Sequence, residues 1–326
     1  MYDKKKILKD MLEGKAHAHI PIRFFQHFPR EDTLGNRCID AHIRFWKETD
    51  FDFIKIMHDG LSAPIDLSAS GLEQLKEYRP CYDKNPYVKE YIKRATGVNK
   101  GLGGEIDSYC NVFSPITLFR RIEGNRWKSF FAKEPQAVRD ILLYMAEDLA
   151  YMCKQMLTEA GCTGIFLAMQ GAESGEFTPE EYTSYIGESD RYLIDVMEEY
   201  SSYNILHFCG WNGIPNQLEL WRELPGCVVN WDTHVENLSL PEGRKYFGMR
   251  PCMGGFDNRR DGILYSGTRS QVETETIRII EEYVSAFGDT TGLILGGDCS
   301  YLPDFETERF QWVTETVRKW EREHDG

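Results

Sequence analysis

The sequence lacks any long apolar run. No stretch approaches the roughly 18 apolar residues that a membrane-spanning helix requires. The opening segment, MYDKKKILKDMLEGK, has lysines but no apolar run after them, which is not the pattern of a signal peptide. No tract rich in Ser, Gly or Pro divides the chain either, so we predict one domain over residues 1–326.

Basic residues are in the minority, with 38 Lys and Arg against 52 Asp and Glu and a net charge of −14. Nucleic acids and anionic membranes bind basic surfaces, so we expect neither as a partner. The nine cysteines are irregularly spaced and odd in number, which favours free thiols in the cytoplasm over a disulfide framework. A chain of 326 residues can bury a core without metal, so a metal ion here would serve chemistry.

Short apolar runs alternate with amphipathic segments along the chain. Near-continuous apolar runs are typical of strands buried on both faces of a parallel sheet. The expected strands are 19–25, 51–57, 110–116, 164–169, 204–209, 227–231, 249–256 and 292–297.

Helical patterns lie between these runs, at 135–161, 178–203, 271–288 and 304–323. The second begins with Thr178, Pro179 and Glu181, the signature of a capping box. Eight strands alternating with helices predict an α/β fold, a single (β/α)8 TIM barrel with N-terminal helical additions. A doubly wound open sheet is the alternative, and the barrel requires that 60–105 form one long helical insertion.

Polar residues follow the predicted strands one after another. In barrels the active site forms at the carboxyl ends of the strands, although loops are polar in any protein. We therefore expect catalytic roles for Asp59, Glu173 and Asp298. The expected substrate-pocket residues are Gln170, Trp231, Asp232 and Asp257.

His207, Cys209 and Cys299 form a candidate zinc site. Residues i and i+2 of a strand point to the same side, so His207 and Cys209 can reach one ion. Cys299 follows about ninety residues later, and the strand ends of a closed barrel face each other across its mouth. One imidazole and two thiolates suit zinc and leave a fourth position open, as in catalytic sites. The alternative is that both cysteines are buried hydrophobes, which we expect of the other seven.

The segments FDFIKIMHDG, FSPITL, LHFCG followed by VVNWD, and GLILGGDCSYLPD resemble the uroporphyrinogen decarboxylase superfamily along nearly the whole chain. The resemblance implies a barrel, often dimeric, so a homodimer is expected. One branch comprises metal-free decarboxylases of tetrapyrrole biosynthesis. The other comprises zinc-dependent methylcobalamin:thiol methyltransferases, such as those that methylate coenzyme M. Their HxC…C motif matches His207, Cys209 and Cys299.

The methyltransferase branch fits these residues better. Asp59 falls where the decarboxylases place their pyrrole-binding aspartate, but IRFFQHFPRED replaces their arginine-bearing RQAGR motif. A substrate with eight carboxylates needs cationic partners, whereas the expected mouth collects the acids named above.

The resemblance therefore implies methyl transfer from a methylated corrinoid to a thiol acceptor bound at Zn²⁺. Coordination deprotonates such a thiol, and Glu173 or Asp298 would be a fourth ligand or a partner of His207. The chain carries no D-x-H-x-x-G corrinoid motif, so the methylcobalamin would come from a partner corrinoid protein. A decarboxylase with Asp59 as acid/base and a non-catalytic corrinoid- or tetrapyrrole-binding protein are the alternatives.

The N-terminal histidines and several of the tryptophans are expected to have structural roles. We expect His17, His19, His27 and His42 to be surface or cap residues. Trp46, Trp211 and Trp221 are expected core anchors.

Overall fold

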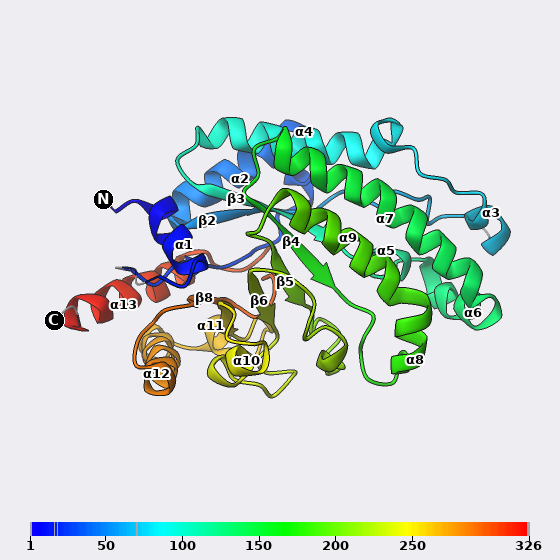
Figure 1. Ribbon diagram of the computed structural model, residues 1–326. Coiled ribbons are helices and arrows are strands. Elements are labelled where there is room, and N and C mark those ends of the chain that lie inside the picture. The colour runs from blue at the N-terminus through cyan, green and yellow to red at the C-terminus, as the bar shows by residue number, and fades with distance from the viewer. Residues whose placement is uncertain (1, 16, 18, 70, 325–326) are drawn as a thin grey trace.

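The computed structural model describes residues 2–15, 17, 19–69 and 71–324. Eight parallel strands form one sheet in the order β1-β8-β7-β6-β5-β4-β3-β2, with helices packed outside it (Figure 1). This topology confirms the predicted (β/α)8 barrel and rules out the doubly wound alternative. The strands are β1 Ile22–Arg23, β2 Phe53–Ile56, β3 Asp107–Phe113, β4 Gly164–Met169, β5 Ile205–Phe208, β6 Val228–Trp231, β7 Cys252–Phe256 and β8 Leu293–Gly297.

The seam between β1 and β2 is held by a side chain. The Asp52 carboxylate accepts a hydrogen bond from the Ile22 amide at 2.7 Å, and the Asp52 amide donates to the Ile22 carbonyl at 3.3 Å. Arg318 of the C-terminal helix lies 3.3 Å from the same carboxylate and balances its charge. A buried acid therefore connects the first two strands and completes the barrel.

The helices are α1 Lys4–Leu12, α2 Gly35–Thr49, α3 Leu72–Lys76, α4 Pro86–Leu102, α5 Pro115–Phe119, α6 Arg126–Lys133, α7 Pro135–Thr158, α8 Pro179–Glu181, α9 Gly187–Tyr200, α10 Leu240–Tyr246, α11 Ile263–Ser266, α12 Arg269–Phe287 and α13 Glu308–His324. The predicted capping box is present, with the Glu181 amide donating to Thr178 Oγ1 at 3.1 Å and the Thr178 amide donating to Glu181 Oε2 at 2.8 Å. A π-helical segment, Tyr182–Ile186, separates α8 from α9, so the helix expected over 178–203 is interrupted.

The prediction of one long helical insertion over 60–105 is wrong. This segment contains an irregular loop, the short helix α3 and then α4, which connects β2 to β3 and is part of the barrel itself. Pro86 at the first helical position and Asn85, whose side chain caps the Tyr87 amide at 3.1 Å, start α4. The loop before α4 is the real departure from a minimal barrel.

An apolar cluster closes the N-terminal end of the barrel. Leu8, Met11 and Leu12 of α1 pack into the barrel interior against the first residues of several strands, among them Phe53 and Ile205. This confirms the N-terminal helical addition and leaves the polar interior residues at the opposite end. No helix in the described part of the chain is both long enough and apolar enough to span a membrane.

Candidate functional site

A layer of polar side chains lies in the barrel interior above the apolar floor. Alternate residues of each strand point inward, and parallel register sets Ala168, His207 and Asn230 side by side on β4, β5 and β6. His207 is 2% exposed and Asn230 is 0% exposed, and Lys55 and Asn111 are equally enclosed. Burying polar groups is unfavourable unless they are paired, so this layer points to a functional site.

His207, Cys209 and Cys299 converge within this layer, as predicted from their spacing. Their donor atoms all lie within 4.8 Å of one another, with 4.0 Å between the two Sγ atoms and 3.5 Å between Cys299 Sγ and His207 Nε2. In a tetrahedral zinc site two sulfurs lie about 3.8 Å apart and sulfur and nitrogen about 3.5 Å apart. The three side chains therefore offer donor types that suit zinc, at distances compatible with a shared ion.

Asn230 fixes the orientation of the His207 ring. The Asn230 Nδ2 donates to the carbonyls of Met253 at 2.8 Å and Gly297 at 3.4 Å, so its oxygen must face His207. That oxygen lies 2.6 Å from His207 Nδ1 and accepts its proton. This fixes the tautomer in which Nε2, toward Cys299, carries the lone pair. Asn230 is a site residue that the sequence analysis missed, although its place two residues before Asp232 on the next strand marked it as inward-facing.

The Cys209 thiol lies in surroundings that favour its ionised form. The hydrogen bond with Cys299 lowers the pKa of Cys209 well below its ordinary value, and contacts with His207 and Gln170 act in the same direction. Gln170 Nε2 donates to Cys209 Sγ at 3.3 Å, and the Gln170 backbone N–H donates to Thr117 Oγ1 at 3.0 Å. Gln170 thus lies in the pocket, as expected, and contacts a candidate ligand directly.

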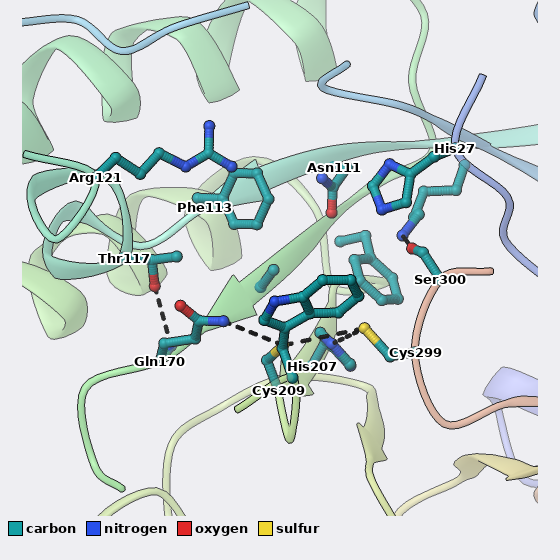
Figure 2. A pocket seen from close by; sticks show the side chains of 14 residues that line it. His27, Asn111, Phe113, Thr117, Arg121, Gln170, His207, Cys209, Cys299 and Ser300 are labelled. Carbon is teal, nitrogen blue, oxygen red and sulfur yellow. Dashed lines mark hydrogen bonds between the residues drawn. The ribbon is translucent and has the colours of Figure 1, made fainter. Parts of the chain in front are cut away.

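One cavity of about 310 Å³ contains this trio at the C-terminal end of the barrel. Figure 2 shows His207, Cys209 and Cys299 on one side, with Arg121, Asn111 and His27 across from them. The Phe166 ring stacks on the His207 imidazole with 5.2 Å between ring centroids. The remaining lining residues are Lys55, Phe113, Thr117, Ala168, Gln170, Trp211 and Ser300.

Besides the trio, the ionisable side chains that line the cavity are basic. Lys55 is 3% exposed, donates to Ser300 Oγ at 3.1 Å, and lies over the rings of Phe25 at 4.0 Å and Phe166 at 4.4 Å. Burial lowers the pKa of Lys55 to about 7. Arg121 adds a guanidinium, 4.6 Å from the Phe113 ring.

The expectation of an acidic mouth is therefore wrong for the cavity. None of the five acids expected there lines it. The sequence showed which acids follow the strands but not which of them turn away from the cavity or pair with nearby cations.

Glu173 and Asp298 are each saturated by neighbouring donors. Arg120 Nη1 donates to both oxygens of Glu173 at 2.7 Å, and the Gly171 amide donates to it at 2.9 Å. Asp298 accepts from the amide and hydroxyl of Thr233 and from the Gly255 amide. Asp298 directly precedes Cys299, so its hydrogen bonds hold the Cys299 segment against the neighbouring strand ends. The hydrogen-bond partner of His207 is Asn230, and neither Glu173 nor Asp298 has that role.

Asp232 and Asp257 are outside the cavity lining. Asp232 Oδ1 accepts from the Val235 amide at 2.9 Å, and burial raises the pKa of Asp232 to about 6. Asp257 pairs with Arg259, 2.8 Å away. The donor atoms of Asp232, His234 and Asp298 lie within 4.8 Å of one another, but His234 Nδ1 is already 2.7 Å from Asp298 Oδ2.

Two of the histidines assigned to the surface have internal roles. His42 is 0% exposed and accepts a hydrogen bond from the Met57 amide at 2.7 Å, so its assignment as a surface or cap residue is wrong. His27 lines the cavity, and its Nδ1 lies 2.7 Å from Asp59 Oδ1. Asp59 therefore meets the cavity only through His27. No spacing pattern in the sequence marked His27.

Trp231, expected in the pocket, lies in the core, and Trp211, expected in the core, lines the pocket. Trp231 is 0% exposed, donates to the Leu238 carbonyl at 2.9 Å and packs against Phe247, so it lies in the layer between strands and helices and outside the cavity. Trp211 is 55% exposed and lines the cavity instead of anchoring the core. Strand parity explains the first result, since Trp231 follows the inward-facing Asn230.

Several solved structures share this fold. A methyltransferase from Methanosarcina mazei superposes with a TM-score of 0.77 at 13% identity, covering 98% of this chain and 99% of that one. A provisionally assigned vitamin-B12-independent methionine synthase from Listeria monocytogenes gives 0.55 at 14% identity, covering 86% and 85%. A β-mannanase from Mytilus edulis gives 0.51 at 9% identity, covering 92% and 91%. These similarities show the fold alone, because barrels host unrelated chemistries.

The family of this chain is identified by comparing its sequence with models of known families. No curated protein matches the chain. The family model described as uroporphyrinogen decarboxylase (URO-D) matches residues 56–320, which include the HxC segment, the late cysteine, the last residue of β2 and all of β3 to β8. The chain belongs to the uroporphyrinogen decarboxylase family.

Proposed function

We propose that this protein is a zinc-dependent methyltransferase that moves a methyl group from a corrinoid donor to a thiol. The observation that supports the proposal is that the donor atoms of His207, Cys209 and Cys299 lie within 4.8 Å of one another inside a cavity, a spacing compatible with three corners of a zinc tetrahedron. Three protein ligands leave one position for an acceptor. A zinc ion bound there would act as a Lewis acid and hold the acceptor as its thiolate.

The residues around the trio prepare it for this task. Asn230 keeps the Nε2 lone pair of His207 available. The side-chain amide of Gln170 donates to Cys209 Sγ and neutralises part of the thiolate charge. Lys55, Asn111 and Arg121 offer donors to the part of the acceptor away from its sulfur. A cavity of about 310 Å³ is at the lower end of small-molecule sites and fits a compact acceptor. The larger corrinoid would approach from the mouth, carried by a partner protein.

Elemental analysis of protein purified without a histidine tag tests the metal site. We expect about one zinc per chain in the wild type and none in a Cys209→Ser, Cys299→Ser double variant. The matched control is Cys81→Ser, Cys227→Ser, which changes two free cysteines outside the cavity and should keep its zinc. A folded wild type without zinc, grown with zinc supplied, would contradict the proposal.

Metal-free decarboxylation is the second candidate, and the cationic lining supports it. Lys55 and Arg121 suit an acidic substrate better than the sequence suggested. This candidate predicts that zinc-depleted protein keeps full turnover of a carboxylic acid substrate. The methyltransferase proposal predicts that methyl transfer from methylcobalamin to a thiol disappears with the zinc and returns when zinc is added.

A further inference from the structure

His27 is held at the rim of the cavity beside the strand end that carries Cys299. Its amide donates to the Tyr301 carbonyl at 2.9 Å, and the Tyr301 amide donates to the Phe25 carbonyl at 2.7 Å. The His27 side chain is 34% exposed and lines the same cavity as the trio. Figure 2 shows its ring beside Asn111 and Ser300.

Asp59 orients this imidazole. Its Oδ1 lies 2.7 Å from His27 Nδ1, and its Oδ2 accepts from the Phe28 amide at 2.9 Å. Burial raises the pKa of Asp59, but the hydrogen bonds from His27 and Phe28 outweigh this and leave the pKa below its ordinary value. An ionised carboxylate only accepts, so the proton between the two side chains is on Nδ1 and the remaining ring nitrogen, Nε2, is left for the cavity.

We propose that His27, held by Asp59, is the base that accepts the proton of the acceptor thiol, an assignment that rests on the function proposed above. The thiol S–H bond breaks with its electron pair left on sulfur, and an N–H bond forms at His27 Nε2. The Asp59 carboxylate stabilises the imidazolium, which then loses the proton to water at the open mouth. A free thiol with a pKa of about 8.5 enters the cavity mostly protonated at neutral pH, so a group there must take the proton that is released when the acceptor is bound as its thiolate.

The other histidines near the site are paired with other groups or lie outside the cavity lining. His207 uses Nδ1 for Asn230, and its Nε2 faces Cys299. His58 is enclosed by aromatic rings, and its buried Nε2 has no hydrogen-bond partner among the described residues. His234 is paired with Asp298 outside the cavity lining. Among the described residues, His27 and His207 are the histidines that line the cavity, and of these His27 has its second ring nitrogen outside the trio.

Several charged groups lie around His27. Asp59 is paired with it, and Lys55 and Arg121 line the same cavity. Burial lowers the pKa of Lys55 to about 7, so this side chain loses its charge as the pH rises through that value. The titratable and charged groups that share the two hollows lined by His27 are Lys55, Arg121, His207, Cys209, Cys299, Arg30 and Asp59.

The test measures demethylation of methylcobalamin by zinc-loaded protein, with 2-mercaptoethanol as the acceptor, across a range of pH. We expect His27→Ala to lower the rate at neutral pH by about 10²–10⁴-fold. The loss should shrink above the pKa of the thiol, where solvent already supplies thiolate, and added imidazole should restore part of the rate. Asp59→Asn should move the apparent pKa of the base downward, because the imidazolium loses its counter-charge.

The control is His19→Gln, which alters another carboxylate-paired histidine, 3.0 Å from Glu321 at the N-terminal end of β1, and should leave rate and pH profile unchanged. Zinc content is measured in every variant. A His27→Ala protein with the wild-type rate and profile overturns the inference alone. An equal loss at all pH values without imidazole rescue also overturns it, because that is the behaviour of a structural residue. A zinc-loaded wild type that never demethylates methylcobalamin contradicts the proposed function, and the His27 step with it.

Discussion

Replacing Asn230 by leucine would test the orientation of His207 directly. The two side chains are similar in size, so the substitution removes hydrogen bonds with little change in volume. Asn230 is 0% exposed and accepts from His207 Nδ1 at 2.6 Å, and its amide group donates to the carbonyls of Met253 and Gly297. Without the acceptor, the His207 ring loses its preferred tautomer and its fixed angle.

The expected effect has two parts. Loss of a partner that orients a metal-binding histidine lowers metal affinity by about 10- to 100-fold. At about 1.4 kcal/mol per factor of ten, this corresponds to about 1.4–2.8 kcal/mol of binding free energy. The unpaired carbonyls and ring nitrogen also lower the stability of the zinc-free fold, at about 1–3 kcal/mol for each group left without a partner.

Asn204→Leu provides the matched control. Asn204 is also 0% exposed, accepts from the Ile165 amide at 2.8 Å, and donates to Glu198 and the Ser201 carbonyl, outside the cavity. Competition with a chromophoric chelator gives the zinc affinity, and thermal unfolding of the zinc-free proteins gives the stability. We expect both variants to lose stability and only Asn230→Leu to lose zinc affinity.

One result would refute this reasoning. If Asn230→Leu binds zinc as tightly as Asn204→Leu and the wild type, then the hydrogen bond to Nδ1 does not prepare His207 as a ligand. The three donors would then owe their positions to the strands alone.

Two further predictions concern buried charges. Burial raises the pKa of Asp190 to about 7. Between the ordinary carboxyl pKa and pH 7, the folded protein therefore keeps this proton while the unfolded chain has lost it. The free energy of unfolding falls as the pH rises through that window. Asp190→Asn should therefore raise the melting temperature at pH 8 and not at pH 3, and an equal shift at both would contradict the assignment. Glu173 is 1% exposed and paired with Arg120, so Glu173→Gln should lower the free energy of unfolding by about 3 kcal/mol through the uncompensated guanidinium. The zinc content should stay unchanged, and zinc loss in a folded variant would instead make Glu173 a ligand.

The fold was largely predictable because apolar periodicity follows local geometry. The run predicted over 164–169 matches β4 at both ends, and Thr178 caps its helix as expected. The segment 60–105 was misjudged because its loop is fixed by distant contacts. Asn85 there donates to Asp148 of α7 at 2.6 Å, a contact that no local pattern reveals.

The sequence by itself determined the barrel and the trio of donors, because strand alternation places His207 and Cys209 on one side and barrel closure brings Cys299 across the mouth. It also placed acids after five of the eight strands. Only the tertiary structure decided what each polar side chain faces. Pairing across strands turned Asn230 toward His207 and drew Glu173 to Arg120, and Asp59 reached the cavity only through His27. Sequence patterns record which side of a strand a residue occupies, whereas the partner of a charged group depends on segments brought together by folding.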